Sequence, residues 1–258
     1  MSIVSADEEA FVLAGGRSSR MGRDKALLDL NGAPLIEHAL AKLRSLGFEP
    51  RIVGCRPDLE RFAPVIEDRR PGCGPLGGIE AALAVSRAER NLFLPVDLPL
   101  LPVAFLEWML TRARTTGAAL TVPSLTGRPQ PLCSVLCRGL LPQISAAIEK
   151  GSFRVMDALS GTSPASQERA EIDLFAVETI APAQREWSYE RPLHTWFQNL
   201  NCPQDLDGLR GTISGTTKDA ISVSCEKLIE RLAPERGLPL SNSNGHDPQG
   251  KLRARSNS

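Results

Sequence analysis

The stretch Phe11–Lys25 constrains the fold more than any other part of the chain. Its sequence, FVLAGGRSSRMGRDK, begins as a hydrophobic run, passes through two glycines and continues as a polar, basic loop. A strand that ends in glycines can bring backbone N–H groups to an anion, and nearby cations neutralise that anion. The segment therefore predicts a strand whose carboxyl end faces a polyphosphate, although a solvated surface loop could carry the same residue types.

Two common phosphate-binding motifs are absent from this stretch. The Gly-x4-Gly-Lys-Ser/Thr spacing of a P-loop does not occur, and neither does the Gly-x-Gly-x-x-Gly fingerprint of dinucleotide-binding domains. Most NTPases and most NAD enzymes are thereby excluded. The remaining groups that could grip a phosphate are Arg17, Arg20, Arg23 and Lys25, since arginine offers a planar fork and lysine a mobile point charge.

Composition places the chain among ordinary globular proteins. Its 258 residues are 42% hydrophobic and 23% charged, enough for one α/β domain with a core or for a domain with an appendage. The formal net charge is zero, so we expect no nucleic-acid partner. No apolar run is long enough to span a bilayer, and the acidic N-terminus does not resemble a signal peptide, so we expect a cytoplasmic protein without membrane contacts.

Cysteine and histidine are too sparse and too scattered to predict a metal centre. The six cysteines form no Cys-x-x-Cys pair, and the chain has only three histidines. Cys133 and Cys137 fall on one face of a period-two pattern. Small core residues on a strand explain that pattern better than a metal site or a disulfide does.

Apolar segments alternate in strand-like and helix-like patterns at βαβ spacing. This alternation predicts an α/β fold with a largely parallel sheet covered by helices on both faces, and a ligand beyond the carboxyl ends of the strands. The expected strands are 10–14, 51–55, 64–66, 92–96, 118–122 and 132–137, and the expected helices are 34–46, 58–62, 79–88, 103–114 and 140–150.

The pattern weakens after Gly161 and returns at Thr195–Leu209. From Arg210 onward the chain is rich in Ser, Gly, Thr and Pro. We therefore expect one domain over residues 10–209 and a C-terminal extension, 210–258, that is largely disordered with one short helix at 219–232.

Two aspartates are expected at carboxyl ends of strands, beside the first loop. Asp68 follows the run PVIE, and Asp97 follows LFLPV. A carboxylate that faces bound phosphates is a natural Mg²⁺ ligand, whereas for each aspartate taken alone the capping of a turn is the better explanation. The neighbouring basic loop favours metal binding by Asp97. The glycine-rich segment 72–78 could hold an anion or a base edge at a helix start, or could serve only as a tight connection.

With these residues the chain resembles the molybdenum cofactor guanylyltransferases, within the wider nucleotidyltransferase family. The resemblance covers about residues 10–209 in the family's order. The matching segments are LAGGRSSRMGRDKALL, GAPLIEHAL, VIEDRRPGCGPLGGI, LPVDLPLL, RPQPLCSVLC and FQNLNCPQDL.

The resemblance implies a Rossmann-like, three-layer αβα nucleotidyltransferase fold and a Mg²⁺-dependent transfer of GMP from GTP to the molybdopterin cofactor. It implies backbone contacts to base and ribose, phosphate contacts from two basic side chains, an acidic contact to the base or ribose, and a metal-binding carboxylate. The residues carried over in these roles are Leu13, Ala14, Gly15 and Gly16 for the backbone contacts, Arg20 and Lys25 for the phosphates, Asp68 for the acidic contact and Asp97 for the metal.

The second substrate is less well defined by the sequence. An anionic phosphate nucleophile needs no strong general base, which fits motifs without histidine. The candidates for binding molybdopterin are Arg154, Asn199 and Asn201, although a solvated helix residue is the slightly better explanation for Arg154. The resemblance also leaves a molybdoenzyme or its chaperone as a candidate protein partner.

One departure from the family pattern keeps other functions open. Val53 stands where the family often has an asparagine that contacts the nucleotide. A cytidylyl or sugar-1-phosphate nucleotidyltransferase is the nearest alternative. A nucleotide-binding regulatory module without turnover is an alternative of a different class, against which the joint presence of Lys25 and Asp97 argues.

Overall fold

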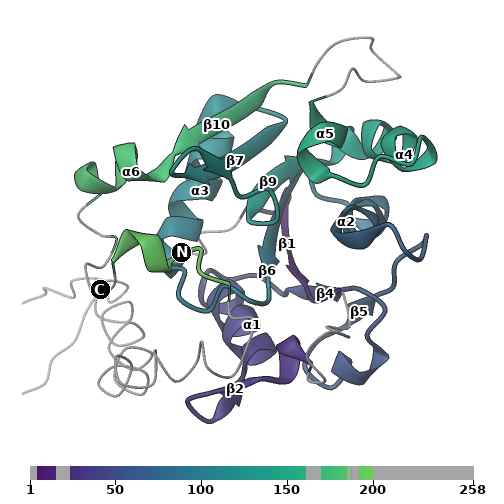
Figure 1. Cartoon of the computed structure of the whole chain (residues 1–258), viewed down its shortest axis with the longest axis horizontal. Coiled ribbons are helices and arrows are strands. Elements are labelled where there is room, and N and C mark those ends of the chain that lie inside the picture. The colour runs from purple at the N-terminus through teal and green to yellow at the C-terminus, as the bar shows by residue number, and fades with distance from the viewer. Residues whose placement is uncertain (1–4, 16–23, 161–169, 185–186, 188–191, 200–258) are drawn as a thin grey trace, which may run out of the picture. The chain divides into compact units, whose positions relative to one another are not determined.

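The computed structural model describes residues 5–15, 24–160, 170–184, 187 and 192–199 (Figure 1). The chain divides into two compact units, Met1–Gly215 and Thr216–Ser258, and every described residue lies in the first. The expected C-terminal extension with its helix, and most of the expected ordered segment 195–209, lie outside the described residues.

Eight strands of the described part form one sheet in the order β10-β7-β9-β6-β1-β4-β5, with β8 paired to β7. The β1–β4, β1–β6, β4–β5 and β7–β10 pairs are parallel, whereas β9 and β8 run antiparallel to their neighbours. The strands are β1 (Glu8–Leu13), β4 (Arg51–Val53), β5 (Val65–Ile66), β6 (Arg90–Pro95), β7 (Leu120–Leu125), β8 (Arg128–Pro129), β9 (Ser134–Cys137) and β10 (Ile172–Ala176), and a separate antiparallel pair is formed by β2 (Asp29–Leu30) and β3 (Ala33–Pro34).

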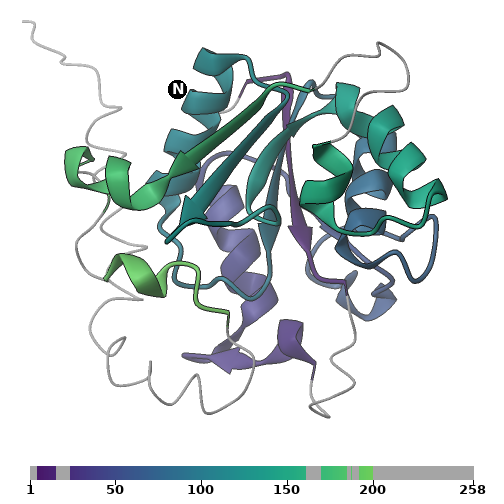
Figure 2. The ribbon, with the colours of Figure 1, turned by 45° about the horizontal axis from the view of Figure 1, so that its top comes forward.

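Helices cover both faces of this sheet, as Figures 1 and 2 show: α1 and α3 lie on one side, and α2, α4 and α5 on the other. The α-helices are α1 (Leu35–Ser45), α2 (Gly74–Val85), α3 (Val103–Thr116), α4 (Leu141–Glu149), α5 (Val155–Leu159) and α6 (Val177–Ile180). The 3-10 helices are η1 (Lys25–Leu27), η2 (Pro57–Leu59), η3 (Arg138–Leu140), η4 (Ala181–Ala183) and η5 (Leu193–Thr195).

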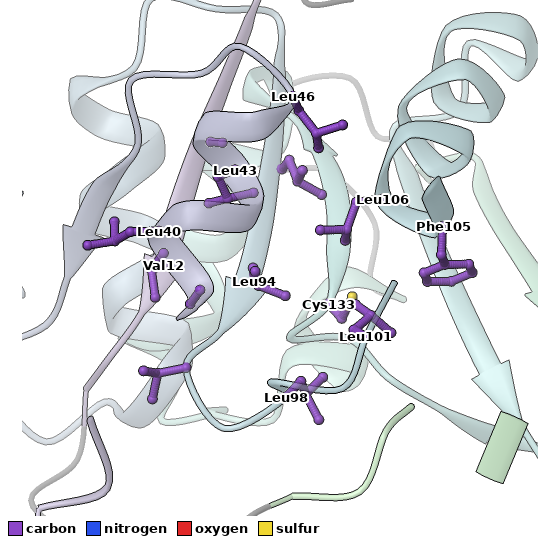
Figure 3. Close-up of a cluster of buried hydrophobic side chains, with 14 of the residues drawn as sticks. Val12, Leu40, Leu43, Leu46, Leu94, Leu98, Leu101, Phe105, Leu106 and Cys133 are labelled. Carbon is purple, nitrogen blue, oxygen red and sulfur yellow. The ribbon is translucent and has the colours of Figure 1, made fainter. Parts of the chain in front are cut away.

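The central strands β1, β6 and β7 are largely buried on both faces because each face meets a helical layer. Along β1, Val12 packs with the α1 and α3 side, and its neighbours Phe11 and Leu13 pack with the α2, α4 and α5 side. Figure 3 shows the first of these clusters, in which Leu40 and Leu43 of α1 lie beside the sheet. The predicted three-layer α/β fold with a mostly parallel sheet is therefore confirmed.

The element boundaries differ from the sequence expectations in places that have local causes. The helix expected at 79–88 begins at Gly74, and Pro75 lies in its first turn. Proline fits there because the N–H groups of the first turn have no acceptor within the helix. The helix expected at 58–62 is a single 3-10 turn, η2. The edge strand β10 was not expected, because its IDLFA sequence alternates weakly and carries a charge that pairs with Arg112.

The described cysteines are free thiols. Cys133 is buried beside the first residue of β9, and this burial raises its thiol pKa to about 12. Cys137 ends that strand and is half-buried. Both positions agree with the core interpretation. Within the described ranges, no helix combines the length and the apolar character needed to cross a bilayer.

Candidate active site

The carboxyl ends of four parallel strands meet at one edge of the sheet. Backbone hydrogen bonds extend the ladder past each strand: Ala14 donates to Val53 over 3.0 Å, Gly54 to Ile66 over 2.9 Å, and Val96 to Leu13 over 3.1 Å. The segments that follow β1, β4, β5 and β6 therefore start side by side. This is the edge at which an open α/β sheet binds its ligands.

Two of these segments approach each other at backbone distance. Gly54 has a φ of +136°, and a Cβ atom on it would lie 2.8 Å from the Gly15 Cα and 2.9 Å from the Gly15 nitrogen. Only glycine accommodates both the dihedral angle and the contact. Gly15 itself is exposed at this junction.

The structure brings Lys25 and Asp97 together across 72 residues of sequence. Lys25 is the first residue of η1, and Asp97 follows the end of β6; the Lys25 Nζ lies 3.4 Å from the Asp97 Oδ2. Both side chains remain partly exposed, at 27% and 18%. A cation and an anion held at the strand ends, open to solvent, can face a phosphate and a metal ion respectively.

Arg56 is a site residue that the sequence interpretation missed. Only 3% of the Arg56 side chain is exposed. Its guanidinium donates hydrogen bonds to Asp24 and Asp58, and its Nη1 lies 3.5 Å from the Ala14 carbonyl oxygen. The hydrogen bond to Asp58 and the charge of Asp24 raise the Arg56 pKa against the opposing effect of burial. A signal was available, because an arginine two residues after a glycine strand end stands beside the first loop.

Asp68 lies at the same edge, beyond β5, in a different environment. Its Oδ1 is buried and makes no hydrogen bond within the described structure, and burial raises the Asp68 pKa above its ordinary value. A Cβ on Gly78 of α2 would lie 3.4 Å from that oxygen, 3.0 Å from Val53 Cγ1 and 3.8 Å from Leu13 Cδ2. The carboxylate is therefore next to Leu13, at the end of β1, and Val53, at the end of β4.

The glycine-rich segment after Asp68 contains positions that only glycine adopts easily. Gly72 and Gly74 have φ values of +86° and +60°, and Gly78 leaves room for α2 to approach Val53. The tight-connection interpretation therefore accounts for these glycines. The N-cap residue of α2, Cys73, makes no side-chain hydrogen bond to the start of the helix.

The other predicted residues are exposed side chains or lie outside the described residues. Arg154 is exposed at the position before α5, and its side chain makes no capping bond. Asn199 is exposed at the end of the described segment 192–199. Gly16, Arg20 and Asn201 lie outside the described residues.

The acidic groups of the site suit a hard cation that brings its own water. Across the described ranges, His, Cys, Asp and Glu form no group of three or more that could hold a metal. Mg²⁺ keeps several waters and needs only one or two protein carboxylates when phosphates complete its shell. The single Asp97 carboxylate, partly exposed at the sheet edge, fits that requirement.

Comparison with known sequences places the chain near one group of enzymes. The profile of the MobA-like NTP transferase domain matches residues 10–165. A protein of Carboxydothermus hydrogenoformans named "probable molybdenum cofactor guanylyltransferase" is 35% identical over 150 residues, which cover 57% of this chain and 74% of the relative. A molybdenum cofactor guanylyltransferase of Pseudomonas aeruginosa is 40% identical over 147 residues, covering 55% of this chain and 74% of the relative.

A solved structure supports the same fold. The molybdopterin-guanine dinucleotide biosynthesis protein A of Archaeoglobus fulgidus superposes with a TM-score of 0.64 at 24% sequence identity. The superposition covers 81% of this chain and the whole of the other. At this identity the similarity establishes the fold alone.

Proposed function

The chain belongs to the MobA-like NTP transferase family, and on this premise we propose that it transfers GMP from GTP to the molybdopterin cofactor and releases pyrophosphate. A terminal phosphate oxygen of molybdopterin attacks the α-phosphorus of GTP. The bond from the α-phosphorus to the bridging oxygen breaks, and pyrophosphate leaves with the electron pair. The nucleophile is already an anion near neutral pH, so the protein must position two anions and offset their repulsion.

The observation that carries this proposal is the Lys25–Asp97 pair, in which Lys25 of η1 reaches the carboxylate that follows the end of β6, the strand parallel to β1. We infer that Lys25, together with Arg20, binds the β- and γ-phosphates and stabilises the charge that develops on the leaving pyrophosphate. A charge held in place before the reaction costs no reorganisation when the transition state forms. The ion pair with Asp97 supports this role, because it keeps the ammonium at the strand ends when no phosphate is present.

The family is generally metal-dependent, and we propose Mg²⁺ as the ion and Asp97 as its protein ligand. When bound, the ion would offset charge on the phosphate oxygens. Asp97 would hold the ion beside Lys25, and the mixed charges of the pair would orient the triphosphate along the edge of the sheet.

We propose that the backbone of Leu13, Ala14, Gly15 and Gly16 holds base and ribose, and that Asp68 accepts hydrogen bonds from the guanine N–H edge. The unpartnered, buried Oδ1 of Asp68 supports this assignment. Such an oxygen is costly to leave unpaired, and a ligand with two adjacent N–H donors would relieve the cost. Guanine presents such donors on its Watson–Crick edge, whereas uracil presents one and cytosine an amino group beside acceptors.

For the second substrate, molybdopterin, our candidate contact residues remain Arg154, Asn199 and Asn201. Arg154 and Asn199 are exposed and so are accessible to a large ligand. A molybdoenzyme or its chaperone is the proposed recipient of the product, since a dinucleotide form of the cofactor has to be passed to the enzyme that uses it.

The test is pyrophosphate release by the full chain in the presence of molybdopterin and Mg²⁺. We expect release with GTP and little with CTP or UTP at equal concentration. Release with CTP would favour the cytidylyl alternative that Val53 leaves open. Binding of GTP without release under any condition would favour a regulatory module and contradict the proposed transfer.

A further inference from the structure

One buried guanidinium contacts residues on both sides of the polar loop that follows β1. The Arg56 Nη1 lies 3.5 Å from the Ala14 carbonyl oxygen, before the loop, and 3.0 Å from the Asp24 Oδ1, after it. The Nη2 of the same group also donates to Asp24. Arg56 thus ties the first described residue after the loop to the end of β1 and to its own segment after β4.

Asp24 passes this restraint on to Lys25. Its Oδ1 also accepts from the Ala26 backbone N–H over 3.0 Å, which makes Asp24 the N-cap of η1. Lys25 is the first residue of that helix, and its Nζ reaches Asp97. A continuous series of contacts therefore runs from Arg56 through Asp24 and the η1 backbone to the Lys25 ammonium.

A three-residue helix cannot hold its own position. Such a turn fixes several dihedral angles for one or two hydrogen bonds, so its stability comes from its cap and its tertiary contacts. Lysine adds a long flexible side chain, whose charge is only as well placed as the backbone that carries it. The buried guanidinium of Arg56 holds Asp24, the residue at the N-terminal end of η1, in a fixed place. A solvated cation could not supply such a rigid anchor.

We propose that Arg56 is a positioning residue for guanylyl transfer, which acts through the Asp24 cap to place the Lys25 ammonium at the triphosphate. The inference rests on the proposed function. It adds a residue that makes no assigned contact with a substrate. A purely structural brace is the competing explanation, and the two differ in how Arg56 and Lys25 depend on each other.

The decisive experiment is a double-mutant cycle on kcat for GTP-dependent pyrophosphate release. Arg56→Lys keeps the charge and loses the fork, and we expect it to lower kcat by about 10- to 100-fold, the cost of a small misplacement of a reacting group. In the Lys25→Ala background the same change should alter kcat within about twofold, because the group that Arg56 places is gone. An equal loss in both backgrounds would overturn the proposal.

A second variant approaches the same contact from its other side. Asp24→Asn keeps a good N-cap acceptor and removes the charge that Arg56 binds. We expect it to lower kcat as Arg56→Lys does, with little change in the KM for GTP. If Asp24→Asn leaves kcat at the wild-type value, Asp24 does not transmit the restraint, and the proposal fails.

The matched control is Arg114→Lys. Arg114 forms the same kind of two-pronged pair with the buried Glu8, at the opposite end of β1, with a distance of 2.7 Å between its Nε and the Glu8 Oε1. This change removes a fork of similar geometry away from the site. We expect lower stability with unchanged kcat, and a kcat loss equal to that of Arg56→Lys would point to a general effect of destabilisation.

Hydrogen exchange separates failure of this inference from failure of the proposed function. If the wild type releases no pyrophosphate from GTP, the proposed function is wrong, and exchange of the Ala26 amide still tests the anchor. We expect Arg56→Lys to remove the protection of that amide and Arg114→Lys to retain it. Full protection in Arg56→Lys would show that the cap stands without Arg56 and would overturn the inference.

Discussion

At the scale of single residues, two carboxylates at one sheet edge have opposite environments. Asp97 has a cation 3.4 Å away, whereas the Asp68 Oδ1 is buried without a hydrogen bond in the described structure. A paired and an unpaired acid at the same sheet edge can take different tasks, metal binding for the first and base recognition for the second. Each assignment leads to a distinct prediction.

For Asp97, we expect Asp97→Ala to lower GTP-dependent turnover by at least about 100-fold, the scale of losing one preorganised electrostatic group. The residual rate should no longer respond to Mg²⁺ concentration. Thermal unfolding should be little changed, because the side chain is partly exposed. Asp157→Ala, on the exposed face of α5, is the control. A variant with near-normal turnover and normal Mg²⁺ dependence would remove Asp97 from the metal site.

For Asp68, we expect Asp68→Asn to stabilise the fold and to weaken GTP binding. Burial raises the Asp68 pKa, so the ionised form is the disfavoured one in the folded state. The cost is full above the folded-state pKa and vanishes below the ordinary pKa of the carboxyl group. The gain in stability should therefore be largest near about pH 7 and shrink towards about pH 4.

The binding part of this prediction is measured by titration calorimetry with GTP. Loss of a hydrogen bond to a charged acceptor should weaken binding by about 10- to 100-fold. Unfolding curves at both pH values give the stability part. Unchanged GTP affinity, or a destabilised variant at neutral pH, would contradict the role given to the unpaired oxygen.

At the scale of elements, the site depends on how closely the strand ends meet. The Gly54→Ala change introduces a Cβ 2.8 Å from Gly15 at a φ of +136°. The backbone conformation alone should cost about 1–3 kcal/mol, and relief of the contact should move Gly15. We expect lower stability in urea together with a strong loss of turnover.

Gly117→Ala is the matched control for that change. Gly117 ends α3 with a φ of +68°, and a Cβ there would meet no atom within 4 Å. The left-handed conformation should cost about 1–2 kcal/mol without affecting turnover. If both variants lose stability and activity to the same extent, the close approach at Gly15 has no special role in the site.

The elements also show what the sequence could and could not predict. Short apolar runs identified β1, β4, β5 and β6, and the shared direction of these strands placed Asp68, after β5, and Asp97, after β6, at one edge. Local patterns could not predict β10, whose place depends on pairing with β7 from 52 residues earlier. The position of Arg56 just after a strand end was a local signal, but its pairing with Asp24, 32 positions away, could not be predicted from local patterns.

At the scale of the whole described unit, an aromatic cluster joins the later segments to α3. Phe105 of α3 contacts Trp196 at 5.5 Å and Trp187 at 5.3 Å between ring centroids, and Trp108 contacts Phe175 of β10 at 5.0 Å. These contacts fix the segment 192–199, which carries Asn199. The sequence indicated order near Thr195, but residues far apart in the chain form the cluster.

Trp196 gives a clean test of this anchoring. Trp196→Ala should cost about 3–5 kcal/mol, because it removes a large buried side chain. Trp196→Phe keeps a ring and removes an indole N–H that is buried without a hydrogen bond in the described structure, so it should be nearly neutral. Urea unfolding compares the two variants. Equal losses would mean that packing of the ring does not account for the anchoring.

The most direct test of the central claim is a crystal structure of the protein with Mg²⁺ and a GTP analogue that is not hydrolysed. We expect a triphosphate along the carboxyl ends of β1 and β6, with the β- and γ-phosphates at the Lys25 Nζ and the metal ion on the Asp97 carboxylate. A triphosphate bound anywhere else, with the Lys25–Asp97 pair unchanged, would contradict it.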